Sequence, residues 1–358
     1  MILEALENFI VFSTAFALAG FAIAWGARAW MRRRPDALSP QALARLYTLA
    51  LVLPPATAAW VVTAALLPCW WLAEHELSAA HQEPVHALHL VGALTGRLEP
   101  VLAYTVVLTV AGTALFIGWS TARGHRRLAW AVQRLQLTGA QPSPTSLAMV
   151  RDFARRHGLD VGLVQTDYPV SFVWGFRRSK LVLSSGLLAA LTAGELAGVL
   201  EHEAAHHARR DNLVKFMLGA CAAASLAAPF GRRLLRWRND QVELLCDEVA
   251  AARGSGPLDI AEALVKLRRR TQRTIAPPAL AVPTSRFIPD DDRSVERRVR
   301  RLLAFGDTTR SPVPTPAASC EAAALTLAVL FVLSLAFVGS SAPLAIHTAA
   351  ESVLQALR

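Results

Sequence analysis

Four long stretches without charged side chains constrain this chain more than any other feature of its sequence. They cover residues 8–27, 46–73, 100–122 and 322–346. A helix needs about 20 apolar residues to cross the roughly 30 Å hydrocarbon layer of a membrane. Only 18% of the 358 residues are charged and 53% are hydrophobic. This composition excludes a disordered chain or an ordinary cytosolic enzyme, and the four stretches predict four membrane-spanning helices.

The charges around the first stretch predict its orientation. Glu4 and Glu7 precede it, whereas four arginines lie between positions 28 and 34. A cleaved signal peptide has the reverse polarity, and basic residues favour the cytoplasmic side of a membrane. We therefore expect the N-terminus outside, the 28–45 loop inside and the 74–99 loop outside. The net charge of +10 is interpreted first as a sign of topology and of contact with anionic lipid.

This topology predicts a domain plan. Residues 1–122 would form three transmembrane helices with their loops, and residues 123–319 a cytosolic domain large enough for its own core. Residues 320–346 would form the fourth span, and residues 347–358 a short external tail. Pro54 and Pro55 are expected to kink the second span. The apolar stretch 216–231 is too short for a confident span, so it is expected either to dip into the membrane as a hairpin or to pack on the spans.

The cytosolic segment contains the motif HExxH on a helical pattern. His202 and His206 are four residues apart and share one face of a helix, so both imidazoles can bind one Zn²⁺. Glu203 lies one step round the helix, where it can reach a zinc-bound water. In this interpretation Glu203 is the catalytic base, and the chemistry is hydrolysis of a peptide bond. The alternative is a helix with two satisfied histidines and a solvated glutamate.

A second helical pattern downstream offers carboxylates for the same metal. Glu243 and Asp247 are again four residues apart. We predict Glu243 as the third zinc ligand and Asp247 as the acceptor of a hydrogen bond from a ligand histidine. The alternative leaves Glu243 exposed and makes Asp247 or Glu248 the ligand. Cys246 is expected to be a small core residue.

Several motifs together resemble a known family. They are Ser-Phe-Val-Trp-Gly-Phe from Ser171, Leu-Val-Leu-Ser-Ser-Gly from Leu181, HEAAH followed by Arg-Arg-Asp-Asn-Leu, and Glu-Leu-Leu-Cys-Asp-Glu from Glu243. This order is similar to the BlaR/MecR-type (antirepressor) integral-membrane zinc metallopeptidases, whose most specific element is the pairing of HExxH with ExxCD. The resemblance covers residues 120–305 and the three preceding spans. It implies a gluzincin-like domain that faces the cytoplasm and cleaves a transcriptional repressor, directly or indirectly.

The resemblance does not extend to antibiotic sensing. Those sensors carry an external penicillin-binding domain with an SxxK serine, and no SxxK occurs in this sequence. We therefore expect a relative without that sensor domain. Heat-shock and prenyl-protein membrane proteases also pair HExxH with a downstream ExxxD, so they stay open as comparisons for substrate choice.

The sequence thus predicts a polytopic α-helical membrane protein with a mainly helical α+β, zincin-like (gluzincin) cytosolic domain that contains a small β-sheet. Short strands are expected at 161–165, 171–174 and 180–183. The expected cofactor is one Zn²⁺ per chain, and the expected location is a bacterial-type inner membrane. The expected function is hydrolysis of peptide bonds in a cytoplasmic or membrane protein, as regulated repressor cleavage in signalling, with membrane-protein quality control or a non-catalytic zinc-bound scaffold as alternatives.

The expected partners are a protein substrate and the lipid bilayer, and a homodimer is left open. Five arginines follow Asp292 on one predicted helix, and we expect them to form a solvated face beside anionic lipid. Direct binding of nucleic acid is not expected, since no nucleic-acid-binding motif accompanies these arginines. The group that stabilises the oxyanion is left open among Tyr168, His207 and several arginines.

Overall fold

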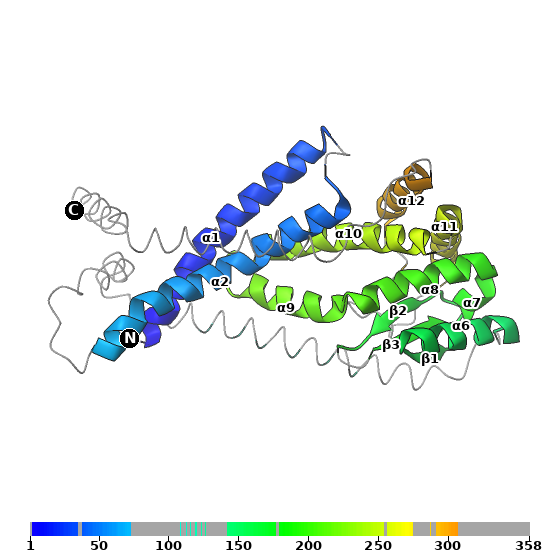
Figure 1. Cartoon of the computed structure of the whole chain (residues 1–358), viewed down its shortest axis with the longest axis horizontal. Coiled ribbons are helices and arrows are strands. Elements are labelled where there is room, and N and C mark those ends of the chain that lie inside the picture. The colour runs from blue at the N-terminus through cyan, green and yellow to red at the C-terminus, as the bar shows by residue number, and fades with distance from the viewer. Residues whose placement is uncertain are drawn as a thin grey trace. The chain divides into compact units, whose positions relative to one another are not determined.

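The structure, a computed structural model, describes most of the residues around the HExxH motif and the first two apolar stretches (Figure 1). The described residues are 2–34, 38–72, 142–176, 179–253, 256–274, 287 and 291–306, together with positions 108, 112, 115, 119, 123 and 126. The predicted fourth span, the 74–99 loop and the external tail lie outside them, as does nearly all of the third span.

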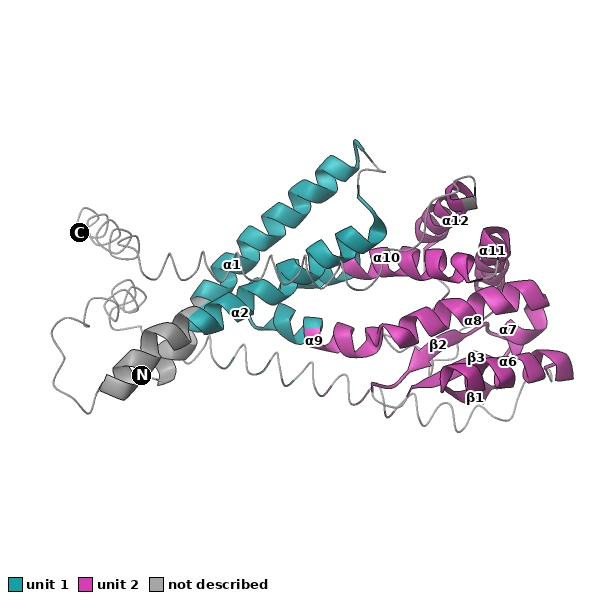
Figure 2. Cartoon of the chain, viewed as in Figure 1, with its two compact units in different colours: residues 1–117, 218–237, 314–358 teal, residues 118–217, 238–313 magenta. Residues whose placement is uncertain are grey.

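The chain forms two compact units, coloured separately in Figure 2. The first unit comprises residues 1–117, 218–237 and 314–358, and the second comprises residues 118–217 and 238–313. Helices α9 (Asp211–Ala223) and α10 (Ala228–Ala252) each contribute residues to both units. Residues 218–237 are thus grouped with the N-terminal helices.

Two long helices dominate the first unit. Helix α1 spans Ile2–Met31 and helix α2 spans Pro40–Leu72, so each is longer than the apolar stretch that predicted it. Phe12–Met31 and Pro40–Trp60 are long and apolar enough to cross a membrane. A Cβ on Gly20 would lie 3.2 Å from the carbonyl oxygen of Ala50, so this glycine permits close packing of the two helices.

The turn between α9 and α10 packs on α1. The Ser13 hydroxyl donates a hydrogen bond to the Ala224 carbonyl oxygen (3.2 Å), and the Leu226 N–H donates one to Thr14 Oγ1 (3.1 Å). The Phe21 ring lies with its centroid 4.8 Å from that of Phe230. These contacts fit both expectations for the apolar stretch, a hairpin that dips into the membrane and a helix packed on the spans.

A three-stranded sheet lies in the second unit. Strands β1 (Asp160–Val164), β2 (Ser171–Trp174) and β3 (Lys180–Ser184) have the order β1-β3-β2. Strand β3 runs parallel to β1 and antiparallel to β2. All three predicted strands are present within one residue of their expected bounds, and the sheet leaves β2 at an edge.

Together with this sheet, helices form much of the core of the second unit. They are α6 (Pro144–His157), α7 (Ser185–Ala190), α8 (Ala193–Ala208), α11 (Pro257–Arg273) and α12 (Asp292–Gly306). Helix α8 contacts both β2 and α11, and α11 contacts α12. The apolar side chains of α8, β3 and α11 meet in one buried cluster that includes Leu183, Leu196, Leu200, Leu264 and Leu267. Helix α8 is thus held between the sheet and α11.

Local interactions determine where α8 begins. Thr192 and Glu195 form a capping box, in which the Thr192 N–H donates to Glu195 Oε2 at 2.7 Å and the Glu195 N–H donates to Thr192 Oγ1 at 3.4 Å. Gly186 of the preceding helix α7 lies close to the loop after β1. A Cβ added at this position would lie 2.3 Å from the Asp167 carbonyl oxygen. Only glycine fits there, and this close approach ties α7 to the sheet.

Candidate metal centre

Helix α8 places three polar side chains in the core of the second unit. His202 and Glu203 are fully buried and His206 is nearly so. Their apolar neighbours Val199 and Leu200 are buried as well, so this part of the helix is covered on more than one face. Buried polar groups need partners, and neighbouring side chains supply most, but not all, of them here.

Helix α10 brings Glu243 to the two histidines. His202 Nε2 and His206 Nε2 are 3.1 Å apart. The Glu243 carboxylate lies 3.4 Å from His202 Nε2 and 3.5 Å from His206 Nε2. Three residues predicted as zinc ligands from the sequence therefore converge on one point, although 37 residues or more separate Glu243 from the histidines along the chain.

The donor set fits a zinc ion. Ligand atoms about 2.0–2.1 Å from a tetrahedral zinc lie about 3.3 Å from one another. The two histidine Nε2 atoms are 3.1 Å apart, and each lies 3.4–3.5 Å from a different oxygen of Glu243, which is close to this spacing. Two imidazoles and one carboxylate are also a known catalytic ligand set for zinc, and they leave a fourth position for water or substrate. Burial acts to raise the pKa of Glu243, but His206, His202 and Arg298 outweigh it and hold that pKa well below its usual value. The carboxylate is therefore ionised, as a metal ligand must be.

The other two carboxylates of this region have different partners. Asp247 Oδ1 lies 2.9 Å from His202 Nδ1, on the side of the ring away from Glu243. Glu248 Oε1 accepts a hydrogen bond from Arg301 Nε at 2.8 Å. The structure thus places Glu243 at the histidine nitrogens, Asp247 behind His202 as expected, and Glu248 elsewhere. Cys246 is fully buried, as expected of a small core residue.

Arg298 holds Asp247 in place. Its Nε and Nη2 atoms donate to the two oxygens of Asp247, both at 2.6 Å, in a bidentate pair. Burial acts to raise the pKa of Asp247, but Arg298 and His202 outweigh it and lower the pKa. A third donor, Nη1, bonds to the carbonyl oxygen of Phe287 at 2.6 Å, and the Phe287 ring packs edge-on against His202.

This arginine corrects one prediction. Arg298 was expected to belong to a solvated basic face, but it is 2% exposed and paired with Asp247. Its neighbours Arg297 and Arg300 are exposed, as expected. Composition cannot separate the buried arginine from the exposed ones. A helical spacing of three residues from the buried Val295 could have suggested that Arg298 faces inward.

Asp211 was given no role from the sequence, yet it supports the second histidine. His206 Nδ1 and Asp211 Oδ2 are 2.8 Å apart, and Arg238 Nη2 donates to Asp211 Oδ1 at 3.2 Å. Burial acts to raise the pKa of Asp211, but His206, Arg209 and Arg238 lower it to about 2. The run Arg-Arg-Asp-Asn-Leu could have indicated this role, because its acidic residue follows the HExxH helix and is the first residue of the next helix.

Glu203 has one engaged oxygen and one without a partner. Ser171 Oγ donates a hydrogen bond to Glu203 Oε1 at 2.7 Å. Glu203 Oε2 is buried, and no described residue lies within hydrogen-bonding distance of it. Burial raises the pKa of this carboxyl, against the opposing effects of His202, His206 and Ser171. A buried carboxylate oxygen beside two histidine ligands is suited to accept a proton from a water molecule.

The outer edge of β2 runs beside these residues and already has partners of its own. Asn212 Nδ2 donates to the Val173 carbonyl oxygen at 2.8 Å, and the Phe287 N–H donates to the Ser171 carbonyl oxygen at 3.3 Å. Of the residues left open for the oxyanion, His207 lies with Arg210 and Asn212 at a small cavity next to His206. Tyr168 packs instead on the apolar cluster of Val164 and Phe172.

Comparison with known proteins shows what this domain is similar to. Residues 145–264 match the sequence model of Peptidase family M48, and the matched segment includes α8 and Glu243. Peptidases of this family depend on a metal ion, generally zinc, which agrees with the cluster of His202, His206 and Glu243. The chain therefore contains a segment that is similar to metallopeptidases of this family.

Two curated relatives agree with this class. The chain is 32% identical over 126 residues to a protein named Protease HtpX homolog from Acidiphilium cryptum (strain JF-5), an alignment that covers 32% of this chain and 44% of the relative. It is 28% identical over 225 residues to a Protease HtpX homolog from Gemmatimonas aurantiaca, covering 52% of this chain and 78% of that relative. The chain thus spans less than half of the first relative. These similarities support a metallopeptidase of the M48 kind; the BlaR/MecR type stays a hypothesis.

Proposed function

We propose that this protein is a membrane-bound, zinc-dependent endopeptidase with one Zn²⁺ held by His202, His206 and Glu243. The observation that carries the proposal is the convergence of these three side chains at the spacing of tetrahedral zinc ligands. The M48 match and the two proteases similar to this chain support the same reaction. Helices α1 and α2, both apolar enough to span a bilayer, support attachment to a membrane.

The chain's own residues supply the proton transfers. Zinc, when bound, acts as a Lewis acid that polarises the scissile carbonyl and lowers the pKa of a nearby water. The oxygen of the water adds to the carbonyl carbon while Glu203 Oε2 takes a proton from that water. Glu203 then delivers the proton to the leaving nitrogen as the C–N bond breaks. Ser171 holds the other oxygen of Glu203, which fixes the direction of the free one.

Strand β2 is the proposed support for an extended substrate. It is the edge strand beside α8, and an edge strand can bind a peptide through main-chain hydrogen bonds. Since Asn212 and the Phe287 main chain bond to carbonyl groups of β2, a substrate laid along this edge would compete with both. Proline at Val173 removes a main-chain donor from this strand and should weaken substrate binding.

Two substrate classes follow from different observations. The ExxCD motif formed by Glu243, Cys246 and Asp247 favours regulated cleavage of a transcriptional repressor, because it carries the resemblance to BlaR/MecR-type peptidases. The similarity to proteases named HtpX homologs favours the alternative, a protease that removes membrane proteins in quality control. In both versions we expect the peptidase domain on the cytoplasmic side of an inner membrane, with a protein substrate and the bilayer as partners.

The variant Glu203→Gln tests the proposed function. It keeps the size of the side chain but removes the base, so cleavage of β-casein, an unfolded test substrate, should fall by about 10²–10⁴-fold while zinc stays bound. Glu201→Gln is the matched control, since Glu201 lies on the same helix and pairs with Arg253. Its rate should stay close to that of the parent.

The outcomes separate the alternatives. Full cleavage by Glu203→Gln would contradict the assigned base. Zinc binding without cleavage in the parent, on casein and on repressor and membrane-protein substrates alike, would favour a non-catalytic scaffold. Cleavage of casein by the parent would favour the broad protease, and cleavage restricted to a repressor would favour signalling.

A further inference from the structure

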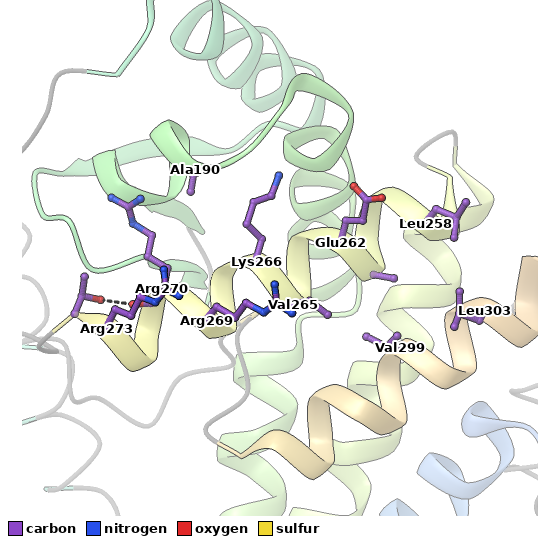
Figure 3. Close-up of a pocket in the computed structure, with 12 residues that line it drawn as sticks. Ala190, Leu258, Glu262, Val265, Lys266, Arg269, Arg270, Arg273, Val299 and Leu303 are labelled. Carbon is purple, nitrogen blue, oxygen red and sulfur yellow. Dashed lines mark hydrogen bonds between the residues drawn. The ribbon is translucent and has the colours of Figure 1, made fainter.

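A large cavity opens on the second unit, between α7, α11 and α12. Its volume is about 840 Å³, which lies within the range of about 300–1,000 Å³ found for small-molecule sites. Figure 3 shows its lining, most of which comes from one face of α11. None of the residues of the metal centre lines this cavity, so the proposed peptidase reaction does not account for it.

One end of the cavity is apolar. Leu258 and Val265 of α11 face Val299 and Leu303 of α12 across it. Leu258 is 61% exposed and Leu303 is 47% exposed, although both are large aliphatic side chains. Exposed aliphatic side chains gathered in a concave surface are a common sign of a binding site.

The other end of the cavity is cationic. Arg269, Arg270 and Arg273 follow one another along the same face of α11, away from Leu258 (Figure 3). Arg270 Nε is oriented by the Asp167 carbonyl oxygen at 3.2 Å. No carboxylate of a described residue lies within 4.0 Å of Arg269 or Arg273, whereas Lys266 nearby pairs with Glu195. The guanidinium groups at this end are therefore available to an anion.

Charge and shape together select the ligand. Arginine presents a planar set of donors that matches phosphate oxygens in bidentate fashion. The single carboxylate of the lining, Glu262, lies nearer the apolar end than the three arginines do (Figure 3). A ligand with a phosphate at one end and a hydrocarbon chain at the other satisfies both ends of the cavity at once.

We propose that this cavity binds an anionic phospholipid, with its phosphate at Arg269, Arg270 and Arg273 and an acyl chain against Leu258, Val299 and Leu303. The chain also carries helices apolar enough to span a membrane, so bilayer lipids are a ligand source at high local concentration. An acidic peptide segment would match the arginines alone.

Photo-crosslinking of the full chain in detergent tests the proposal. The probe is a phosphatidylglycerol analogue with a diazirine in its acyl chain, and the adducts are mapped by peptide mass spectrometry. Adducts are expected in the peptides that contain Leu258 or Leu303, and a phosphatidylcholine analogue should give far fewer. In Arg269→Gln/Arg273→Gln these adducts should fall about tenfold, because two charge-assisted contacts are lost. Arg155→Gln/Arg156→Gln removes the same charge from exposed positions of α6 and should label like the parent.

Three results would overturn the proposal. In the first, the peptides with Leu258 or Leu303 are labelled equally in Arg269→Gln/Arg273→Gln and in the control Arg155→Gln/Arg156→Gln. In the second, the phosphatidylglycerol and phosphatidylcholine analogues label them equally. In the third, adducts form only in other peptides. Inorganic phosphate at millimolar concentration should reduce the labelling only weakly, since it lacks the acyl chain. Complete displacement by phosphate would replace the lipid with a small free anion as the ligand, and displacement by an acidic peptide alone would point to a protein partner.

Discussion

His202 and His206 each have a carboxylate behind the ring, and this arrangement determines which nitrogen faces Glu243. Asp247 lies at Nδ1 of His202 and Asp211 at Nδ1 of His206. A carboxylate at Nδ1 keeps the proton there and leaves Nε2 free to bind a metal. Arginines in turn hold both carboxylates, Arg298 on Asp247 and Arg238 on Asp211. Each histidine thus has a carboxylate near its Nδ1 atom, and each of these carboxylates is paired with an arginine.

Asp211→Asn should weaken zinc binding without abolishing it. The change removes the negative charge behind His206 and leaves the three metal ligands intact, and such partners are typically worth about 10–100-fold in metal affinity. Competition with a chromogenic chelator at pH 7 measures the change. Asp152→Asn, on the exposed surface of α6, is the control and should bind zinc like the parent. Equal affinity in Asp211→Asn would refute this role for Asp211.

The residues that could be predicted here are those whose spacing is local. The pairs His202/His206 and Glu243/Asp247 follow from the helix period, which places residues four apart on one face. The roles of Asp211, Ser171 and Arg298 depend on contacts between different elements, as when Ser171 of β2 reaches Glu203 of α8. A local pattern can mark such a residue, as it does for Asp211 and Arg298, but it does not give the distance to the partner.

At the scale of elements, the HExxH helix depends on a buried charge near its start. The Glu195 side chain is 1% exposed, and Lys266 of α11 donates to its Oε1 at 2.5 Å. Burial acts to raise the pKa of Glu195, but Lys266 and the Thr192 hydrogen bonds outweigh it and lower the pKa. The ion pair links α8 to α11, and it is tied to the capping box through the same carboxylate.

The stability contribution of this pair should depend on pH. Because the folded-state pKa of Glu195 is lowered, the stabilisation is fully present above the unfolded-state pKa of about 4.3 and is lost as pH falls through the folded-state value. Glu195→Gln keeps the capping acceptor but not the charge. Its thermal midpoint should lie below that of the parent at pH 7, and the gap should close as pH falls towards 3. A gap that is independent of pH would contradict the ion pair.

The elements themselves were largely predictable, and their assembly was not. The strands and the two motif helices follow from apolar periodicity and flanking turn residues. The grouping of residues 218–237 with α1 and α2 depends on tertiary contacts such as the pair Phe21 and Phe230. A run of small apolar residues fits a membrane hairpin and a packed helix pair equally well.

At the scale of the whole molecule, the two units hold different features. The first unit holds the helices that are apolar enough for a bilayer, and the second holds the proposed metal ligands, the sheet and the cavity beside α11. Since α9 and α10 contribute to both units, the helix that carries Glu243 is continuous with residues packed on α1 and α2.

The proposed topology can be tested with reporter fusions. A phosphatase that is active only outside the cytoplasm should be inactive when fused after Asp36 and active when fused after Glu83. The expectation follows from the arginines at 28–34 and the scarcity of basic residues at 74–99. The reverse pattern would invert the topology, and equal activity at both sites would argue against a second span.

The central claim is that His202, His206 and Glu243 hold one zinc ion, and the metal content of the purified chain tests it most directly. Elemental analysis of the parent, of Glu243→Ala and of the matched control Glu201→Ala, all prepared without chelators, gives zinc per chain. We predict about one zinc in the parent and the control, and a clear loss in Glu243→Ala with the fold retained by circular dichroism. Zinc retained in a folded Glu243→Ala, or absent from the parent, would contradict the three-ligand centre.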